Sequence, residues 1–315
     1  MELRIWEYGA DNDKIESFLH SAALAHNIAP KSEEWFHWKF EQSPYGKAIL
    51  ACAFDGNIVA GCVALGQGIA VCNGITIKSA LSYETFVHPN YQGKGLFKRL
   101  IVLAEDACKR ENIDILYNFP NSNSLPGFKS MGWRHIPKYL EYKINIRKVF
   151  RCLANFGSLT KPFQPIEPSV LPSPTIHSDN QDIEPNFINS LWSREYIEWR
   201  FFKHPASQYI YIDDKGVFGI ARVGYRGELK ECQILHITHN DCTTYKHALR
   251  ALVKHINKVE KPDIISICCS KGSFLSYNTW AFIKVPTKAN FTYKILTNKI
   301  TTDNFVISSI DFHTY

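Results

Sequence analysis

A short pattern of residues occurs twice in this chain, and it constrains the possible folds more than any other sequence feature. Segments 34–44 and 195–205 both contain a tryptophan, a basic residue and a phenylalanine in a row, followed four residues later by a proline. After each segment come an apolar stretch, a turn and a second apolar stretch, with the turns at Asp55-Gly56 and at residues 214–216. Self-similarity of this kind indicates that a structural unit has been duplicated.

A proline-rich stretch lies between the two copies. Six of the fifteen prolines fall within residues 151–185, beside serine, asparagine and aspartate, which is typical of a linker. The length of 315 residues is also about twice that of a typical domain. We therefore expect a first domain over residues 1–150, a linker over 151–185 and a second domain over 186–315.

Hydrophobic periodicity predicts the elements of both domains. The strands expected in the first domain cover residues 3–8, 48–55, 58–65, 81–87, 114–118 and 139–144, with a hairpin at Asn73-Gly74. The helices expected there are 13–27, one that Ser32 caps and that ends before Pro44, 96–110, and a short one around Phe128. In the second domain, strands over 232–238 and 264–268 flank a helix over 246–258. The expected fold class is α/β, with two tandem domains that each hold a mixed sheet flanked by helices.

The charge balance and the cysteines exclude several functions. The net charge is only +6 and no dense basic run occurs, so we expect no nucleic-acid partner. The nine cysteines show no repeated C-x-x-C spacing, so we expect neither a metal site nor a disulfide framework. The first twenty residues lack the features of a signal peptide, and no apolar run approaches the ~18 residues that span a bilayer. A cytoplasmic protein without a membrane span is expected, and its oligomeric state stays open.

The stretch 86–97 carries the most specific chemical signal. An apolar strand ends at Val87, a turn contains Gly93 and Gly95, and an apolar helix begins at Leu96. Backbone N–H groups in such a turn lie at the positive end of the helix dipole, where they hold an anion such as a pyrophosphate. A phosphate-bearing ligand is therefore expected at the start of this helix.

This order of residues resembles the GNAT superfamily of acyl-CoA-dependent N-acyltransferases, whose acyl-CoA loop reads Gln/Arg-x-x-Gly-x-Gly/Ala after a strand that ends in Val-x-Pro. Gln92 to Gly95 fill this loop, and Phe97 replaces the last small residue. The segment 121–133 resembles the last helix of the family and its closing Gly-aromatic pair. The resemblance implies an acyltransferase that uses acetyl-CoA as co-substrate and needs no metal.

The resemblance also implies where acyl-CoA binds. Its pantetheine arm would insert between the strands 81–87 and 114–118, and the N–H of Val87 would polarise the thioester carbonyl. One such donor contributes roughly 100- to 1000-fold to the rate. Asparagines near the second strand would contact the arm, or would act as loop and cap residues instead. The complete set of expected contacts is Phe86, Val87, Gln92, Gly93, Lys94, Gly95, Leu96, Phe97, Asn118, Asn121, Asn123 and Phe128.

The catalytic positions depart from the family. The family often places its general base four or six residues before the valine, where this chain has Tyr83 and Leu81. Tyrosine is a poor base because its pKa is about 10. Glu84 is the nearest carboxylate, but it points to the other face unless a bulge intervenes. We therefore take Glu84 and Tyr83 as the catalytic candidates. Phe128 stands where the family commonly has a tyrosine general acid, so the identity of the general acid stays open.

The second domain has no glycine in the equivalent loop, residues 239–246, so we do not expect it to bind acyl-CoA. Tandem proteins of this kind resemble acyltransferases of bacterial surface-polysaccharide pathways, which implies that the acceptor partner is a nucleotide-linked amino sugar. Two alternatives are a FemABX-like aminoacyl transferase, which has no need of the CoA loop, and a non-catalytic protein that senses acyl-CoA or a sugar nucleotide. Basic and aromatic side chains would either hold the diphosphate and base or form the core: Lys39, Arg200, Trp35, Trp38 and Trp133.

Overall fold

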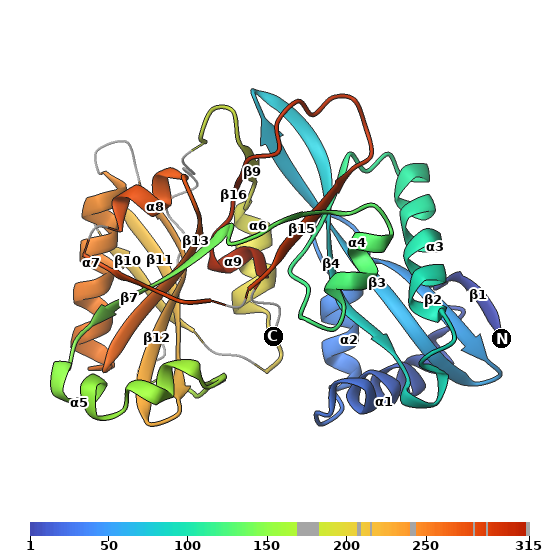
Figure 1. The fold of residues 1–315 in the computed structure, drawn as a ribbon, viewed down its shortest axis with the longest axis horizontal. Coiled ribbons are helices and arrows are strands. Elements are labelled where there is room, and N and C mark those ends of the chain that lie inside the picture. Colours follow the sequence, from blue (N-terminus) through green and yellow to red (C-terminus); the bar gives the residue numbers. More distant parts are fainter. Residues whose placement is uncertain are drawn as a thin grey trace. The chain divides into compact units, whose positions relative to one another are not determined.

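The computed structural model describes residues 1–168, 183–206, 209–214, 216–239, 244–279, 281–287 and 289–312. The chain divides into two compact units, neither of which is continuous in sequence (Figure 1). The first unit comprises residues 1–137, 203–205 and 289–303, and the second comprises 138–202, 206–288 and 304–315. Residues 169–182 of the expected linker and residue 215 of the expected turn lie outside the described residues.

The elements of the first unit follow the predicted order. Strands β3 and β4 are longer than predicted because Asn73 and Gly74, with φ of 49° and 77°, form a tight turn that joins them directly. Ser32 caps α2, as predicted, by accepting a hydrogen bond from the N–H of Trp35 at 3.1 Å. The elements are β1 (Glu2–Ile5), a 3-10 turn (Asn12–Lys14), α1 (Ile15–His26), α2 (Glu33–Glu41), β2 (Ile49–Asp55), β3 (Ile58–Cys72), β4 (Ile75–Val87), a 3-10 turn (Pro89–Tyr91), α3 (Leu96–Arg110), β5 (Ile115–Asn118), α4 (Leu125–Ser130), β6 (Arg134–Ile136) and β15 (Phe291–Ile295).

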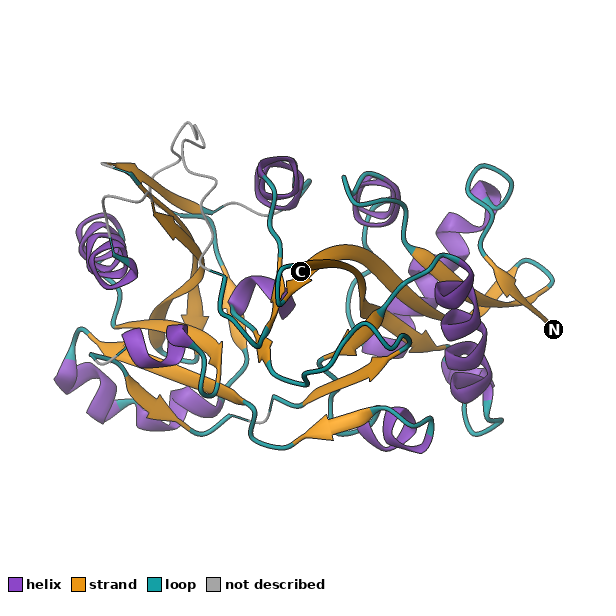
Figure 2. Ribbon diagram, turned by 90° about the horizontal axis from the view of Figure 1, so that it is seen from above, coloured by secondary structure: helices purple, strands orange, loops and turns teal. Residues whose placement is uncertain are grey.

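The first unit holds one mixed sheet with the strand order β1-β2-β3-β4-β5-β15-β6. Neighbouring strands are antiparallel except β4 and β5, which are parallel. Helix α3 packs on the sheet through buried residues such as Leu100 and Ala104. Helices α1 and α2 contribute Phe18, Phe36 and Phe40 to an aromatic cluster. Helices thus flank the strands of this unit, as Figure 2 shows, which agrees with the predicted fold class.

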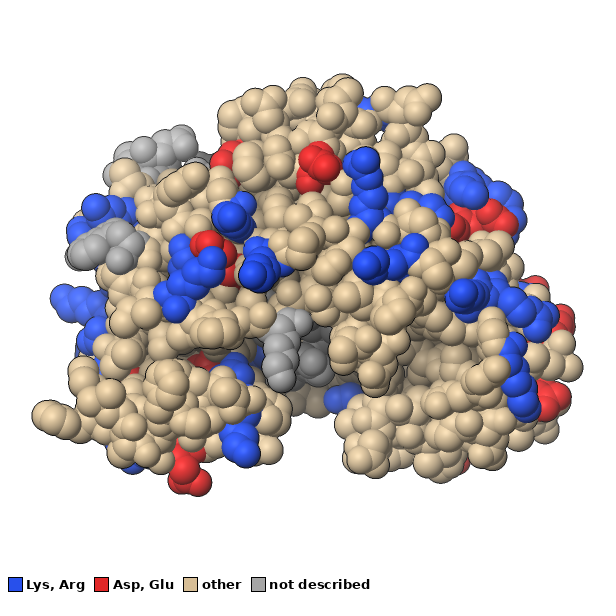
Figure 3. Space-filling view, viewed as in Figure 1, with Lys and Arg blue, Asp and Glu red and all other residues tan. Residues whose placement is uncertain are grey.

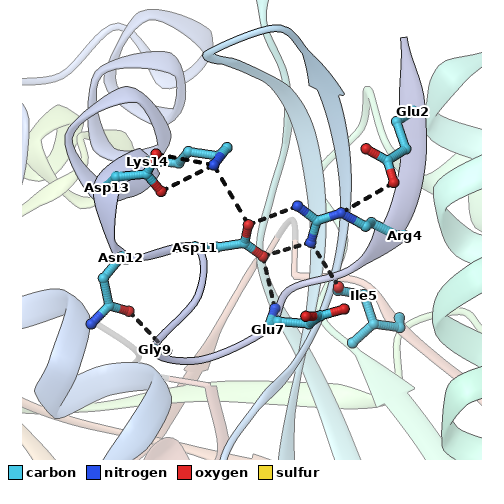
Figure 4. Close-up of polar contacts among 9 residues, drawn as sticks. All are labelled: Glu2, Arg4, Ile5, Glu7, Gly9, Asp11, Asn12, Asp13 and Lys14. Carbon is cyan, nitrogen blue, oxygen red and sulfur yellow. Dashed lines mark hydrogen bonds and ion pairs between the residues drawn. The ribbon is translucent and has the colours of Figure 1, made fainter.

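A buried ion pair holds β1 against the start of α1 (Figure 4). The side chain of Asp11 is 4% exposed, and its carboxylate accepts hydrogen bonds from the two terminal nitrogens of Arg4 at 2.6 and 2.7 Å. The N–H of Glu7 donates to the same carboxylate at 2.8 Å. The guanidinium and this N–H hold the pKa of Asp11 below its usual value. The pair therefore stabilises the fold above the usual pKa of aspartate and is lost in stronger acid.

Apart from β8, the second sheet repeats the strand order of the first sheet from β2 to β6. Its sheet reads β10-β11-β12-β13-β7-β14, with β8 beside β11, and β12 and β13 are its parallel neighbours. Helix α7 packs on this sheet through Leu249, Leu252 and Ile256. The elements are β7 (Leu140–Ile146), α5 (Val149–Ala154), a 3-10 turn (Phe156–Thr160), β8 (Phe163–Pro165), β9 (Ile188–Ser190), α6 (Arg194–Ile197), a π-helix (Glu198–Phe202), β10 (Ile210–Asp214), β11 (Val217–Arg226), β12 (Leu229–His239), α7 (Tyr245–Val259), β13 (Ile264–Ser270), α8 (Phe274–Asn278), β14 (Ile283–Val285), β16 (Phe305–Val306) and α9 (Ser309–Phe312).

The two units exchange one strand each. The first unit contains β15 from the C-terminal half of the chain, and the second unit contains β7 from the N-terminal half. The strand predicted over 139–144 is β7, and it lies between β13 and β14 in the second unit. β15 takes the corresponding place in the first unit, between β5 and β6. The prediction that the strand over 139–144 closes the first sheet is therefore wrong. Periodicity identifies a strand, but it does not identify the sheet that the strand joins.

Main-chain hydrogen bonds show which residues of the exchanged strands correspond. The N–H of Leu296, after β15, donates at 2.8 Å to the carbonyl of the residue just before β5. The N–H of Arg147, after β7, donates at 2.8 Å to the carbonyl of the residue just before β13. Lys294 and Asn145, each two residues earlier, therefore occupy matching positions in the two sheets.

The exchanged strand β15 carries the counter-ion of a buried carboxylate in the first unit. The Nζ of Lys294 lies 2.6 Å from the carboxylate of Glu105 on α3, a side chain that is 7% exposed. The buried residues Leu100, Ile101, Ala104 and Cys108 of α3 match Ala248, Leu249, Leu252 and Ile256 of α7, so Val253 of α7 stands where Glu105 stands in α3. Lys294 would find no carboxylate at this position in the second unit, and Asn145 in the first would leave a buried carboxylate without its counter-ion. The exchanged arrangement avoids both.

The second unit binds β7 through buried polar groups. The carboxylate of Glu231, fully buried, accepts hydrogen bonds from Tyr142 of β7 and from the Nε of Arg226, the latter at 2.6 Å. On the next residue of β7, the Nζ of Lys143 donates to the carbonyl of Ser276 at 2.7 Å. These contacts satisfy the polar side chains of β7 in this sheet.

Candidate active site

The parallel strands β4 and β5 part in the middle of the first sheet. Their pairing runs from Ser79 and Ile115 to Ser82 and Asn118, and the ladder stops there while β4 continues to Val87. A gap therefore opens between the two strands at the end where β4 leads into the glycine-containing loop. This is the opening into which the resemblance places a pantetheine arm.

The main chain of Val87 faces this opening. Val87 pairs with Gly61 of β3, and the adjacent hydrogen bond runs from the N–H of His88 to the carbonyl of Ala60 at 2.9 Å. In an antiparallel ladder, that pattern makes Val87 and Gly61 a non-hydrogen-bonded pair. The N–H of Val87 therefore points away from β3, toward the side from which β5 has parted. With this orientation, the N–H of Val87 can donate to a carbonyl oxygen that lies in the opening.

A β-bulge interrupts β4 beside the opening. The pairing with β3 shifts between Cys62 and Ala64, so that Glu84 and Thr85 together face a single residue. Glu84 has a φ of 45°, in the left-handed region that side chains other than glycine rarely adopt. A bulge changes the direction of the side chains that follow it. In a regular strand Glu84 would point away from the substrate face, and a bulge at this position removes that restriction.

Tyr83 packs toward α2. Its ring stacks on Phe40 with 5.9 Å between ring centroids, and the Nζ of Lys39 lies 4.4 Å from the ring centroid. The ring lies directly over Gly66, where any Cβ would overlap it. Gly66 was not identified from the sequence, although a glycine inside a strand is a known signal of close approach. Tyr83 is thus positioned by packing and by a cation–π contact.

The glycine turn offers an open cradle at the start of α3. Gly93 and Gly95 have φ of 75° and 70°, and no atom lies within 4 Å of the Cβ that either residue would carry. Gly95 is the N-cap of α3 and supplies no side-chain cap, so the first N–H groups of the helix are directed outward. Such a turn accommodates a phosphate group, and the residues present therefore fit acyl-CoA.

Side-chain contacts hold the loop in place. The Nε2 of Gln92 donates to the carbonyl of Val87 at 3.1 Å, and the hydroxyl of Tyr91 donates to Asp55 at 2.8 Å. The Nζ of Lys94 lies 3.4 Å from a main-chain carbonyl of the same loop. Asp55 was not identified from the sequence, because the contact joins residues that are far apart along the chain. The loop is therefore ordered before any ligand arrives.

Aromatic packing lies beneath the start of α3. Phe97 meets Phe128 edge to face at 5.4 Å, and Phe128 meets Trp133 at 4.8 Å between centroids. Phe128 is 1% exposed and Leu96 is 2% exposed. Phe128 is therefore too buried to contact a cofactor directly, and it packs against Phe97 at the start of α3 instead. A Cβ on Gly127 would overlap the ring of Phe97.

The three predicted asparagines have different environments. Asn118 ends β5 and is 7% exposed, at the point where β4 and β5 part. The Oδ1 of Asn121 accepts hydrogen bonds from the N–H groups of Asn123 and Ser124 at 2.9 and 3.0 Å, which caps the approach to α4. Asn123 is exposed. The capping role weighed for these residues thus applies to Asn121, while Asn118 lies at the opening.

Several residues singled out in the sequence belong to the core. Phe86 is 3% exposed and packs edge to face on Phe18 at 5.1 Å, so its side chain points away from the opening. The side chains considered for a diphosphate are all buried in this structure: Lys39, Trp35, Trp38, Trp133 and Arg200.

The corresponding opening in the second unit is filled by the segment 304–312. β12 and β13 pair in parallel over four residues and then part. In the gap, the N–H groups of Ser270 and Cys268 donate to the carbonyl of Ile307 at 2.9 Å and to the Oγ of Ser309 at 3.0 Å. The cavity that remains there has a volume of about 50 Å³. Residues 240–243 of the glycine-free loop lie outside the described residues.

On the face drawn in Figure 3, Lys and Arg side chains are interspersed with acidic and uncharged ones. In the described ranges, no group of three or more His, Cys, Asp and Glu residues is placed to hold a metal ion. None of the described helices has the length and apolar composition needed to cross a membrane.

Comparison with protein families matches residues 9–136 to the acetyltransferase (GNAT) domain. This range contains the parted strands, the bulge, the glycine turn and α3. The first unit therefore contains a GNAT acetyltransferase domain, and the protein is an acyltransferase.

Solved structures of similar fold cover nearly the whole chain. The GCN5-related N-acetyltransferase from Anabaena variabilis aligns with a TM-score of 0.62 at 12% identity, over 94% of this chain and 73% of that one. A probable N-acyltransferase from Enterococcus faecalis gives 0.59 at 13% identity, over 94% and 72%. Eis1 from Mycobacterium abscessus gives 0.58 at 11% identity, over 94% and 74%. At these identities the likeness concerns the fold. No curated protein matches the sequence.

Proposed function

We propose that this protein is a cytoplasmic N-acetyltransferase that moves an acetyl group from acetyl-CoA to the amino group of a nucleotide-linked amino sugar. The observation that carries the proposal is the junction of the parted strands, the outward N–H of Val87 and the open turn at Gly93 and Gly95. The turn suits the pyrophosphate, the gap suits the pantetheine arm, and the N–H suits the thioester carbonyl.

Acyl transfer from sulfur to nitrogen makes two demands on the chain. As the amine attacks the carbonyl carbon, negative charge develops on the oxygen, and the N–H of Val87 donates to it. The C–N bond forms, the C–S bond breaks, and CoA leaves as a thiolate that takes up a proton. The amine loses its proton to Glu84, which the bulge turns from the direction expected for a regular strand. Tyr83 contacts the acceptor.

The second unit is, in this proposal, a degenerate copy of the first. It repeats the strand order of the first sheet from β2 to β6, but the segment 304–312 occupies the gap that acyl-CoA would need. The equivalent loop also lacks glycine. We therefore assign one acyl-CoA site to the chain. The amino-sugar acceptor is supported by the resemblance of the tandem sequence to polysaccharide-pathway acyltransferases.

Release of free thiol from acetyl-CoA, measured against a panel of nucleotide-linked amino sugars, tests the proposal. Gly93→Asp places a Cβ and a negative charge in the cradle, so we expect it to abolish acetyl-CoA binding and turnover. Gly74→Asp is the matched control, since Gly74 has a φ of 77° and equally open surroundings but lies in the hairpin turn. Glu84→Gln should lower kcat by roughly 100-fold or more and leave acetyl-CoA binding intact.

The outcomes separate the proposal from its alternatives. Acetyl-CoA binding without thiol release from any amine would indicate a sensor. If the protein does not bind acetyl-CoA at all, a FemABX-like aminoacyl transferase becomes the remaining candidate. Turnover that survives Glu84→Gln with an unchanged pH profile would remove Glu84 as the base.

A further inference from the structure

The second unit has a pocket at a place that side chains fill in the first unit. In the first unit, the Nζ of Lys294 and the indole nitrogen of Trp133 both donate to Glu105, at 2.6 and 2.7 Å, between α3 and β15. The matching positions in the second unit are Asn145 and Val253, which cannot form this ion pair. A pocket of about 250 Å³ lies there, between α7 and the end of β7.

Four basic residues line this pocket. Lys246, Arg250 and Lys254 follow one another at intervals of four residues along one face of α7, and Arg147 approaches from the strand side. None of the described residues that line the pocket is acidic. A pocket lined by several lysine and arginine side chains suits a ligand that carries more than one negative charge.

The guanidinium of Arg147 is held in position by two amides. Its Nε donates to the Oδ1 of Asn257 at 3.1 Å, and its Nη1 donates to the Oδ1 of Asn145 at 3.2 Å. The third nitrogen, Nη2, is left to donate to a ligand. A planar guanidinium oriented in this way suits phosphate oxygens better than a flexible ammonium does.

The remaining wall of the pocket is apolar. Leu249 is buried and, with Val253 and Phe282, forms a surface beside the cations. An inorganic ion makes no use of such a surface, whereas a base or sugar ring packs against it. The volume of about 250 Å³ lies just below that of typical small-molecule sites, which begin at about 300 Å³, so part of a ligand would extend beyond the pocket. We infer that the second unit binds a nucleoside phosphate here, with its phosphates at the cations and its ring against Phe282.

Isothermal titration of the full-length chain with ADP, UDP and inorganic pyrophosphate at low ionic strength tests this site. The titrations use the Gly93→Asp background, so that the glycine turn of the first unit does not contribute. Gly95→Asp, at the other glycine of the same turn, serves as the background if Gly93→Asp does not fold, because CoA itself carries a nucleoside diphosphate and would compete for the proposed site. We expect a nucleoside diphosphate to bind, and Arg250→Gln and Arg147→Gln each to weaken it about tenfold or more. Lys258→Gln, on the same helix but outside the pocket, should change the affinity less than twofold.

The proposal predicts a specific order of affinities. Both nucleotides should bind more tightly than pyrophosphate, because only they contact the apolar wall. The absence of saturable binding by all three probes would overturn the site. Equal losses in Arg250→Gln and Lys258→Gln would reduce it to general electrostatic attraction and likewise overturn it. Tighter binding of a single-stranded oligonucleotide than of either nucleotide would replace the small ligand by nucleic acid.

Discussion

Glycines near the active site have two distinct purposes at the scale of single residues. Gly93 and Gly95 have positive φ and open surroundings, so they shape the main chain of the phosphate cradle. Gly66 and Gly127 lie beneath aromatic rings instead, and the absence of a Cβ lets those rings approach the main chain. Substitutions should therefore affect ligand binding at the first pair and packing at the second.

Gly127→Ala tests the packing role. The added Cβ would overlap the ring of Phe97, so we expect a loss of about 1–3 kcal/mol in the free energy of unfolding, measured in urea. Phe97→Leu in the same chain should recover most of this loss, because the two residues share one space. Gly157→Ala, at a glycine with no atom within 4 Å of its Cβ, should change stability by less than about 0.5 kcal/mol. Equal effects of the two alanines would contradict the packing role.

At the scale of elements, the segment 304–312 decides which unit can bind acyl-CoA. β16 pairs with β9, and α9 enters the gap between β12 and β13. Ile310 is 2% exposed and belongs to the core of the second unit. The gap that serves as a binding site in the first unit is therefore part of the core in the second.

The carboxyl group of Asp311 on α9 makes this closure pH dependent. Burial raises the pKa of Asp311 to about 7, although the N–H of Ser308 and the Oγ of Ser190 donate to it at 2.8 and 3.0 Å. A carboxyl group whose pKa is higher in the folded than in the unfolded state favours folding in acid. Its contribution is complete below the unfolded value of 3.8 and is lost as the pH rises to about 7. We expect urea unfolding to show this loss, on the order of 4 kcal/mol, as the difference between wild-type protein and Asp311→Asn. Burial lowers the pKa of His236 to about 4, which adds a pH dependence of the opposite sign to both proteins.

Asp311→Asn should remove the contribution of Asp311 and leave that of His236, so the stability of this variant should rise with pH between about 4 and 6.5. Asp303→Asn, at a side chain that is 57% exposed, should retain the pH dependence of the wild-type protein. The ion pair of Asp11 does not interfere, because its pKa is lowered and it titrates in stronger acid. The same pH dependence in wild-type protein and Asp311→Asn would show that another group is responsible.

At the scale of the whole molecule, the exchange of β7 and β15 joins the folding of the two units. Neither sheet is complete without a strand from the other half of the chain. The ion pair of Lys294 and Glu105 and the contact of Tyr142 with Glu231 make each strand specific for its sheet. We therefore expect neither half to fold independently.

Expression of residues 1–150 alone tests this dependence. The fragment lacks β15, and its own β7 would place Asn145 opposite the buried Glu105. We expect no cooperative unfolding of a monomer by circular dichroism, and recovery when residues 151–315 are co-expressed. Asn145→Lys in the fragment should restore part of the cooperativity by supplying the missing counter-ion. A fragment that unfolds cooperatively at the midpoint of the full chain would contradict this expectation.

Most local features were predictable from the sequence. The cap at Ser32, the hairpin at Asn73-Gly74, α3 and the glycine turn all follow from interactions within a few residues, where side-chain chemistry and backbone preference act directly. The resemblance at residues 86–97 likewise pointed to the acyltransferase class, because the phosphate cradle is a continuous stretch of chain.

Other features depended on contacts between distant residues. The bulge at Glu84 arises from the pairing of β4 with β3, and the burial of Lys39 and Phe128 from packing that periodicity does not specify. The strand exchange brings Lys294 to its counter-ion Glu105, which lies far away along the chain. The sequence by itself determined the elements and the chemistry of the loop. Only the tertiary structure decided which strands share a sheet and which of two similar gaps stays open, because those choices depend on charges and side-chain volumes brought together by folding.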